Sequence, residues 1–410
     1  MAVSALEEVA RSGRAARDAH ADLRAADPAA IAEALRAMAR GVVGRADAIL
    51  SANALDLAAA ESALAPALVD RLRLDEGRLA RMSDQIEALA ALDDIAPLAG
   101  SRDLPGDLVM HELRRPVGVI GANYEARPNV TVDVASQLIK SRNAGVLRTG
   151  AAALRSAIAL HDEVIRPALN DAGLDSGAIQ LIRSADREAA RALVALPRII
   201  PLVILRGSGE TTAALAREAA ANGVRTLAHA EGGGVLYVHA SADRERTSAL
   251  VERSLDRLGV CNRLNLLLVD DAIWEARLAE ILAVLDRIGV RASLPPHAHP
   301  LGHEWALDDG AEATVTVAPI AGPAAAAGLA NDETSGLAAA IVSEDREAAE
   351  VFLAAYGGTG AFWNATTRIL DGFAMLGAPE TGINVDRVPG PRGPVTFRDL
   401  HLRQYVVVPR

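Results

Sequence analysis

The chain contains a single cysteine, Cys261, in the stretch formed by residues 258–264. A helix-like segment precedes it and the apolar run 264–269 follows, so the thiol is expected where a loop enters a buried strand. A lone cysteine has no disulfide partner within the chain, and most such residues are small buried hydrophobes. A thiol in a loop can also be a nucleophile. The residues around Cys261 leave both interpretations open.

A second group of chemistry-bearing residues lies in the stretch 124–133, which follows the short apolar run 117–121. A helix is expected to begin near Asn129, whose side chain can cap it, and Pro128 fixes its entry. An ordinary strand-to-helix turn accounts for that backbone but leaves Tyr124 and Arg127 unexplained at the mouth of a sheet. An arginine beside a helix N-terminus suits an anion or an oxyanion.

Two glycine-rich stretches offer backbone N–H groups to a ligand. The first, 207–212, follows an apolar strand and opens a helix, so it could hold a phosphate. Such turns are common, and the spacing is not that of a G-x-G-x-x-G motif. The second, 230–234, places flexible backbone beside Glu231, and a plain turn is favoured there over a loop that carries an acid/base residue.

His297, His299 and His303 are the residues that invite a metal interpretation. Pro300 separates His299 from His303, and only Glu304 and the acidic pair 308–309 lie nearby. This spacing matches no common zinc pattern. We therefore expect solvated loop residues and predict no metal site.

The bulk composition sets the frame for these groups. The chain of 410 residues exceeds what one core usually supports, so two domains are expected. Half of the residues are hydrophobic and only 3% are aromatic, which is typical of a helix-rich α/β protein. A net charge of -11 argues against a nucleic-acid partner. No run of 18 apolar residues or signal peptide is seen, and one cysteine suits a reducing cytoplasm.

The elements that must position these residues alternate along the chain. Residues 1 to about 95 form a helical layer, with Asp27 as an N-cap, and the charged segment 70–74 is not expected in the core. Strands are expected at 108–113, 117–121, 145–147, 179–182, 200–205, 224–227, 235–238, 264–269, 313–317 and 338–342, with helices between most of them. This alternation predicts parallel sheets whose loops meet at one edge. The tail from Tyr405 is expected to pair with another strand or chain.

Several of these stretches together resemble one known family. The segments 117–121 and 124–133 are similar to the signature of the glutamate-5-semialdehyde dehydrogenase (gamma-glutamyl phosphate reductase) family, within the aldehyde dehydrogenase superfamily. Further matching segments follow in the family's order: 140–144, 147–148, 260–262, 267–269, 364–368, 392–394 and 405–407, with 70–74 before them. The resemblance therefore covers nearly the whole chain.

The resemblance implies an aldehyde-dehydrogenase-like α/β fold, with two Rossmann-type parallel-sheet domains and a small β oligomerisation element. The cofactor-binding domain would span residues 1–235, completed by about 363–390, with 101–116 contributing to oligomerisation. The catalytic domain would span 236–362, and 391–410 would form a C-terminal oligomerisation tail. A homo-oligomer is expected, and glutamate 5-kinase is a further partner that the resemblance admits.

The activity implied is NADPH-dependent reduction of L-glutamyl 5-phosphate to L-glutamate 5-semialdehyde in proline biosynthesis, through a Cys261 thioester and release of phosphate. The implied site residues fall into three groups. They are Cys261, Asn129 and Arg127 for catalysis, Tyr124, Asn262 and Arg257 for substrate binding, and Arg148, Gly207, Ser208 and Glu210 for NADP(H).

The chain also departs from the family pattern around Cys261. The segments 254–259, 265–266, 228–233 and 336–339 all differ, so any general base is either Glu231 or absent. Two alternatives stay open. One is a diverged paralogue that acts on another acyl phosphate or aldehyde, and the other is a non-catalytic paralogue that keeps the fold.

Overall fold

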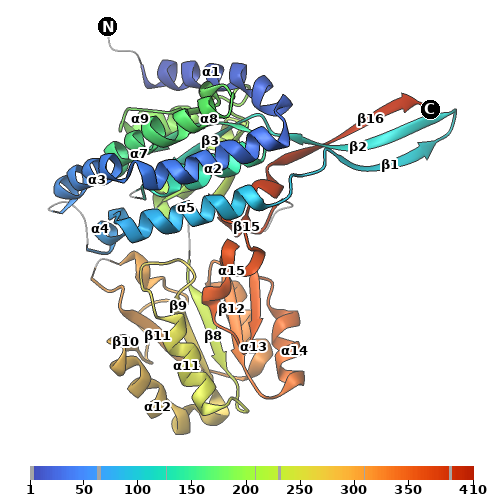
Figure 1. Cartoon of the computed structure of the whole chain (residues 1–410). Coiled ribbons are helices and arrows are strands. Elements are labelled where there is room, and N and C mark those ends of the chain that lie inside the picture. Colours follow the sequence, from blue (N-terminus) through green and yellow to red (C-terminus); the bar gives the residue numbers. More distant parts are fainter. Residues whose placement is uncertain are drawn as a thin grey trace. The chain divides into compact units, whose positions relative to one another are not determined.

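The computed structural model describes residues 4–61, 66–125, 127–207, 209–229, 232–308, 310–386 and 390–410. The chain forms two compact units (Figure 1). Unit 1 comprises Met1–His229, Gly377–Gly382 and Val395–Arg410, and unit 2 comprises Ala230–Leu376 and Ile383–Pro394. The chain therefore passes from one unit to the other more than once.

Unit 1 contains most of the helices. Its elements, where η marks a 3-10 or π-helix, are α1 (Ala5–Ala25), α2 (Pro28–Gly44), α3 (Ala46–Ala60), α4 (Pro66–Leu72), α5 (Glu76–Ala91), β1 (Leu98–Leu104), β2 (Leu108–Pro116), β3 (Val119–Tyr124), α6 (Val130–Lys140), β4 (Ala144–Thr149), η1 (Ala151–Ala153), α7 (Leu154–Leu160), η2 (His161–Ile165), α8 (Arg166–Asp171), η3 (Ser176–Ala178), β5 (Ile179–Leu181), α9 (Arg187–Leu193), β6 (Leu202–Arg206), α10 (Gly209–Ala221), β7 (Arg225–His229), η7 (Phe397–Asp399) and β16 (His401–Pro409). The helical stretch from α7 to α8 contains a π-helical turn, η2.

The sheet of unit 1 is parallel throughout, in the order β5-β4-β3-β6-β7. Successive residues of β3 alternate between two cores: Ile120 and Ala122 pack into the core on one face, whereas Val119 packs into the core on the other. Helices cover both faces, which leaves the strands buried. The predicted α/β class with parallel sheets is confirmed.

Local sequence signals explain where the first helices begin. Ser4 and Glu7 form a capping box at the start of α1. Asp27 accepts a hydrogen bond from Ala29 N at 2.7 Å, with Pro28 as the first residue of α2. The predicted Asp27 cap is therefore confirmed.

The charged segment 70–74 was expected outside the core, but this was wrong, because Leu72 is fully buried between the charged residues.

A three-stranded antiparallel arm, β1-β2-β16, extends from the rest of unit 1 (Figure 1). Strand β16 pairs with β2 from His401↔Pro116 to Pro409↔Leu108, so the expected pairing of the C-terminal tail with a strand is confirmed. Strand β1 was not predicted. Its residues are almost all exposed, so it carries no alternation of buried and exposed side chains from which a strand could be recognised.

Unit 2 holds the second parallel sheet. Its elements are β8 (Gly234–Val238), α11 (Arg244–Ser254), β9 (Leu264–Asp270), η4 (Asp271–Ile273), α12 (Trp274–Arg287), β10 (Arg291–Ser293), η5 (Trp305–Leu307), β11 (Thr314–Ile320), α13 (Gly322–Glu333), β12 (Ala338–Val342), α14 (Arg346–Ala355), β13 (Gly360–Trp363), η6 (Thr367–Ile369) and α15 (Gly372–Leu376). The short strands β14 (Gly382–Asn384) and β15 (Gly393–Val395) each include residues of both units.

The sheet of unit 2 has the order β10-β11-β9-β8-β12-β13, and its strands run parallel. Strand β9 lies inside this sheet and is buried along its whole length. Its side chains alternate, with Leu267 packing into one core and Leu266 and Leu268 into the other. The segment that carries Cys261 therefore leads directly into the most protected part of unit 2.

Within the described ranges, none of the helices combines the length and the apolar character that a membrane span requires.

Candidate active site

In unit 1, the predicted site residues gather at one edge of the sheet. Tyr124, the last residue of β3, pairs in register with Thr149 of β4 and with Arg206 of β6. The loops that follow these three strands therefore start side by side. In parallel sheets this carboxyl edge is where ligands bind. The structure thus brings the 124–133 stretch next to the turn at Gly207.

Asn129 is the N-cap residue of α6, but its side chain does not cap the helix. Its backbone is already helical, with φ -55° and ψ -33°, and the expected side-chain cap was wrong. Instead, Asn129 Nδ2 donates to Asp133 Oδ2 at 2.8 Å. The amide is therefore held by a carboxyl one turn further along α6.

Asp133 was not singled out from the sequence. It keeps some exposed surface, yet the protein packed around its carboxyl raises its pKa to about 6, mainly because burial disfavours the charged form. Arg206, the hydrogen bond from Asn129, and Arg127 each act in the opposite direction. Asp133 is therefore a carboxyl at this edge of the sheet whose charged form is disfavoured by burial and favoured by its neighbours.

Tyr124 is buried rather than open to a ligand, with 1% of its surface exposed. Its hydroxyl donates to Thr131 Oγ1 at 2.9 Å, and burial raises the pKa of Tyr124. The phenol thus joins the end of β3 to the first turn of α6. In this structure it supports the loop that carries Arg127 and Asn129.

Arg148 is also buried, with 5% of its surface exposed. Its guanidinium donates to Asn123 Oδ1 at 3.0 Å and to the carbonyls of Ala185 and Asp186 at 2.8 and 3.1 Å. Burial lowers the pKa of Arg148, and the nearby Glu125 counteracts this. Among the described residues, Arg148 Nε and Thr149 Oγ1 are buried atoms without a hydrogen-bond partner.

Gly207 lies against Glu125, a second residue that the sequence did not single out. A Cβ placed on Gly207 would lie 3.1 Å from the carboxyl carbon of Glu125 and 3.3 Å from Thr212 Oγ1. The absence of a side chain lets the carboxylate approach the turn closely. Glu210 is exposed in the first turn of α10, and the predicted residue Ser208 lies outside the described residues.

In unit 2, Cys261 is partly buried and packs against an apolar cluster that includes Leu337, Ala338 and Leu370. Its carbonyl accepts a hydrogen bond from Gly233 N at 2.7 Å. A Cβ on Gly232 would lie 2.6 Å from that same carbonyl oxygen, so only glycine fits there. The glycine stretch is therefore a close-fitting support for the cysteine. Glu231 lies outside the described residues.

Asn262, predicted to bind substrate, is 4% exposed and fully engaged with the chain. Its Nδ2 donates to the carbonyls of Arg368 and Leu370 at 3.2 and 3.0 Å, and its Oδ1 accepts from the Arg368 guanidinium. Thr367 Oγ1 donates to its carbonyl at 2.8 Å. Asn262 thus fixes the Cys261 loop to the segment 366–370, while Arg257 is exposed on the same loop.

Three further residues complete this part of unit 2, and no motif in the sequence indicates that they lie together. Arg263 has no exposed surface, and burial lowers its pKa to about 10 against the opposing effect of Glu304. Glu304 accepts hydrogen bonds from Gly232 N at 3.0 and 2.9 Å. Asn265 holds the segment around Glu304. Glu304 lies in a region without periodicity, so only the fold reveals its position.

The three predicted loop histidines form an aromatic cluster with Trp305, with ring centroids 4.6–5.6 Å apart. His303 Nε2 lies 2.7 Å from Asp308 Oδ2, and His299 Nε2 lies 2.7 Å from Ser293 Oγ. Within the part of the chain that the structure describes, no group of three or more potential ligands could hold a metal ion.

Comparison with known proteins finds similar sequences and similar solved structures. The sequence model of the aldehyde dehydrogenase family matches residues 1–299. A gamma-glutamyl phosphate reductase from Caulobacter vibrioides is 36% identical over 411 residues, covering 97% of this chain and 98% of that protein. The crystal structure of a gamma-glutamyl phosphate reductase from Thermotoga maritima has a TM-score of 0.88 at 27% identity, covering 98% of this chain and 99% of that one.

A more distant structure shows how far the fold extends. An acetylating aldehyde dehydrogenase from Geobacillus thermoglucosidasius has a TM-score of 0.74 at 16% identity and covers 98% of this chain and 97% of that one. The predicted aldehyde-dehydrogenase-like fold is confirmed.

Proposed function

Because the chain belongs to the aldehyde dehydrogenase family, and within it to the gamma-glutamyl phosphate reductases, we propose that it reduces L-glutamyl 5-phosphate to L-glutamate 5-semialdehyde in proline biosynthesis. The observation that carries this proposal is the setting of Cys261. The only cysteine of the chain is partly exposed at the entrance to β9 and rests on a glycine turn. A partly accessible thiol on a rigid support is suited to nucleophilic attack.

In this mechanism the Cys261 thiolate attacks C5 of the acyl phosphate, and the C–O bond to phosphate breaks, giving an enzyme-bound thioester. When bound, a nicotinamide cofactor would supply a hydride to the carbonyl carbon of this thioester. The resulting thiohemiacetal anion collapses to the aldehyde and regenerates the thiolate. Since phosphate is the leaving group, no water must be activated, so the reaction does not require Glu231 as a general base.

The other site residues are assigned by the family resemblance and by their local contacts. Arg127 and Asn129 are proposed to stabilise the oxyanion, because an arginine and a fixed amide donor suit developing negative charge. Tyr124 and Asn262 are proposed to act through the loops they hold, since both are buried and hydrogen bonded within the chain. Arg257 is exposed and is proposed to meet an anionic group of the substrate.

A nicotinamide cofactor fits what unit 1 offers at its sheet edge. The buried atoms Arg148 Nε and Thr149 Oγ1 lack hydrogen-bond partners among the described residues, as expected of polar groups in a ligand-binding site. The 13-residue helix α10 begins directly after the Gly207 turn, and its N-terminus favours anions. Arg148, Gly207, Ser208 and Glu210 are proposed to hold the cofactor, with NADP(H) preferred through Arg148.

One observation favours a second candidate. The segment 336–339 lacks the polar residues of the family, and Leu337 and Ala338 pack against Cys261 with almost no exposed surface. An apolar wall suits a less polar acyl group than the glutamyl chain. The second candidate is therefore a diverged paralogue that acts on another acyl phosphate or aldehyde.

The direct test is the reverse reaction with purified protein. NADP⁺ reduction is measured with glutamate 5-semialdehyde, with and without phosphate, for the wild type and Cys261→Ala. Phosphate-dependent turnover that the substitution abolishes supports the first proposal. Turnover only with another aldehyde supports the second candidate. No turnover with any aldehyde, together with no NADP(H) binding, would instead indicate a non-catalytic paralogue.

We also propose that the arm formed by β1, β2 and β16 contributes to a homo-oligomer. Leu402, Tyr405 and Val407 expose 55%, 53% and 49% of their surfaces on this arm, which is typical of an interaction surface. Association with glutamate 5-kinase is a further proposal that rests on the shared acyl phosphate. The cytoplasmic location stays a prediction.

A further inference from the structure

We propose that Glu304 is a positioning residue for Cys261: its carboxylate holds the glycine turn that supports the cysteine and places a negative charge close to Cys261. The inference rests on the proposed function only in taking Cys261 as the nucleophile. All residues involved belong to unit 2. Neither the Cys261 motif nor the family resemblance singled out Glu304, which lies 43 positions further along the chain.

The contact between Glu304 and the turn is direct. Both carboxylate oxygens accept from Gly232 N, at 3.0 and 2.9 Å. A Cβ on Gly232 would lie 2.7 Å from Glu304 Oε1 and 2.8 Å from the Cα of Cys261. The carboxylate and the backbone of Cys261 therefore approach the same small space from two sides. Hydrogen bonds to a charged acceptor are stronger than those between neutral groups.

The same turn is also hydrogen bonded to the loop that carries the cysteine. Gly233 N donates to the Cys261 carbonyl at 2.7 Å, and Gly234 N donates to the Arg263 carbonyl at 2.6 Å. Three successive backbone N–H groups of the turn thus donate hydrogen bonds, one to Glu304 and two to carbonyls of the Cys261 loop. Because the turn is fixed at both ends, loss of the Glu304 contact loosens the support beneath Cys261.

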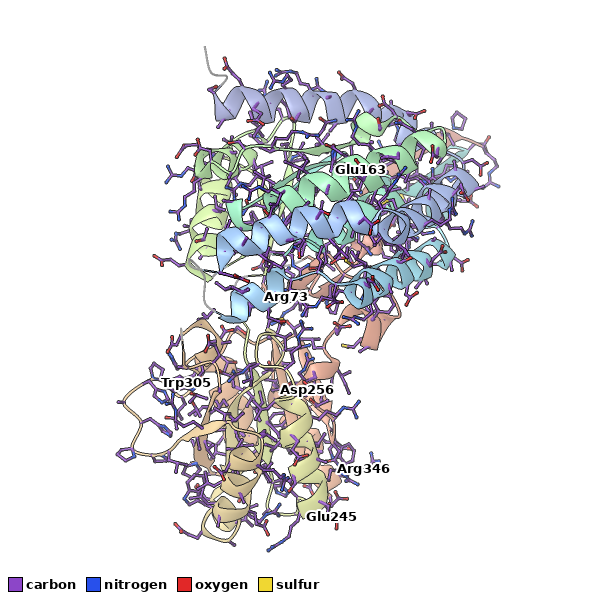
Figure 2. All side chains as sticks on the ribbon, turned by 60° about the vertical axis from the view of Figure 1, so that its left-hand side comes forward. Arg73, Glu163, Glu245, Asp256, Trp305 and Arg346 are labelled. Carbon is purple, nitrogen blue, oxygen red and sulfur yellow. The ribbon has the colours of Figure 1, made fainter. Side chains whose placement is uncertain are left out.

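Glu304 is itself held in place by Asn265 on β9. Asn265 Nδ2 donates to the His303 carbonyl at 2.6 Å, and Asn265 Oδ1 accepts from Trp305 N at 3.1 Å. The single amide therefore brackets Glu304 from both sides. Trp305, labelled on its loop in Figure 2, also donates through Nε1 to Thr316 Oγ1 at 2.9 Å. The carboxylate is held by the sheet and not only by its own loop.

The charges around Glu304 come from several elements. The buried guanidinium of Arg263, the residue just before β9, interacts favourably with both Glu304 and Glu312. On the loop of Glu304, His303 contacts Asp308. Removing the charge of Glu304 leaves Arg263 less compensated close to Cys261. Both changes favour a thiolate, since a nearby negative charge disfavours it and a positive charge favours it.

Two probes separate the holding role from the charge, and both react with Cys261 without cofactor or substrate. Iodoacetamide alkylation at pH 7 reports the thiolate population. Acylation by p-nitrophenyl acetate, in which the thiolate attacks the ester and p-nitrophenolate leaves, also requires an oriented thiol. The variants are Glu304→Gln, which keeps one acceptor for Gly232 N, Glu304→Ala, which keeps none, and Glu312→Gln as a charge-matched control near Arg263.

We expect Glu304→Gln to be alkylated about three- to tenfold faster than wild type, because removal of one nearby negative charge raises the thiolate population. Its ratio of acylation to alkylation should stay near that of wild type. For Glu304→Ala that ratio should fall about tenfold, while the melting temperature of both variants stays close to wild type. Glu312→Gln also leaves Arg263 less compensated but does not alter the turn, so it should keep the wild-type ratio and raise the alkylation rate less than Glu304→Gln does.

Two results would overturn the inference. An unchanged alkylation rate in Glu304→Gln shows that the carboxylate does not act on the thiol. An unchanged ratio in Glu304→Ala, with the fold intact, shows that it does not hold the turn. Should the protein prove inactive as a reductase, these measurements still decide the role of Glu304.

Discussion

Asn129 Nδ2 donates a hydrogen bond of 2.8 Å to Asp133 Oδ2 across one turn of α6. This pairing replaces the helix cap that the sequence predicts for Asn129. It connects the amide to a carboxyl whose protonation changes near pH 6. The orientation of Asn129 is therefore tied to a titrating group.

The first prediction concerns the stability of the fold as a function of pH. The pKa of Asp133 is raised from 3.8 to about 6 by burial, so the protonated form stabilises the fold. This contribution is complete below about pH 4 and is lost as the pH rises through 6, at a cost of about 3 kcal/mol. Asp133→Asn should remove this loss.

Urea unfolding at pH 4 to 7.5 measures the effect. The free energy of unfolding of the wild type should fall relative to Asp133→Asn over this interval, whereas Asp47→Asn, at an exposed helix position, should follow the wild type. A constant difference between wild type and Asp133→Asn at all pH values contradicts the assignment.

The second prediction concerns the turn at Gly207. In Gly207→Ala the new Cβ meets the Glu125 carboxyl at 3.1 Å, so the carboxylate must shift and the turn changes shape. We expect NADPH binding to weaken about tenfold, with a stability loss of about 1 kcal/mol. Titration of cofactor fluorescence measures the affinity.

Gly150→Ala is the control, because nothing lies within 4 Å of a Cβ at that position. It should bind the cofactor as the wild type does. If both alanine variants bind NADPH with equal affinity, Gly207 is not part of the cofactor site.

The third prediction concerns the support of the cysteine loop. Asn262→Ala leaves two buried carbonyls and the Arg368 guanidinium without the side-chain amide that they contact. We expect unfolding to become easier by about 2–3 kcal/mol, because buried groups lose their partners. Cys261 acylation should slow as its loop loosens.

Thermal unfolding and p-nitrophenyl acetate acylation report the two effects. Asn170→Ala, at an exposed position near the end of α8, should change stability by less than about 0.5 kcal/mol. If Asn262→Ala leaves stability intact, the hydrogen bonds of Asn262 do not support the loop.

The fourth prediction concerns the arm. The double variant Tyr405→Asp/Val407→Asp places two charges on exposed apolar positions of β16. If the arm joins copies of the chain, light scattering should show a smaller assembly, with the secondary structure by circular dichroism unchanged. Leu55→Asp, which alters an apolar residue that is 60% exposed on α3, should keep the wild-type mass. If the double variant keeps the wild-type mass, the arm does not form the interface between copies of the chain.

The predictable part of the fold is the part with local signals. The alternation of strands and helices follows from short apolar runs separated by amphipathic segments, and the Asp27 cap follows from residue type. Leu72 was misassigned because its neighbours are charged, while its own side chain points into a small core with Ala60 and Ala153. Strand β1 has no local signal, since its pairing with β2 alone defines it.

The site was only partly predictable for a similar reason. Cys261 and Asn129 stand in recognisable motifs, and the structure places them on loops at strand ends. Glu304 and Asn265 become neighbours only when the loop after β10 folds back on β9, so no spacing in the sequence indicates their contact. The buried states of Arg148 and Asn262 also depend on segments far along the chain.

The pairing of β16 with β2 has a consequence for synthesis. The two strands lie almost 300 residues apart, and Asn143 and Gln137 of unit 1 also bond to Leu400 and Phe397. On the ribosome, the first sheet emerges long before these partners exist. Until residues 395–409 have left the exit tunnel, β2 has an open edge, and the nascent chain is exposed to wrong strand pairing during this interval.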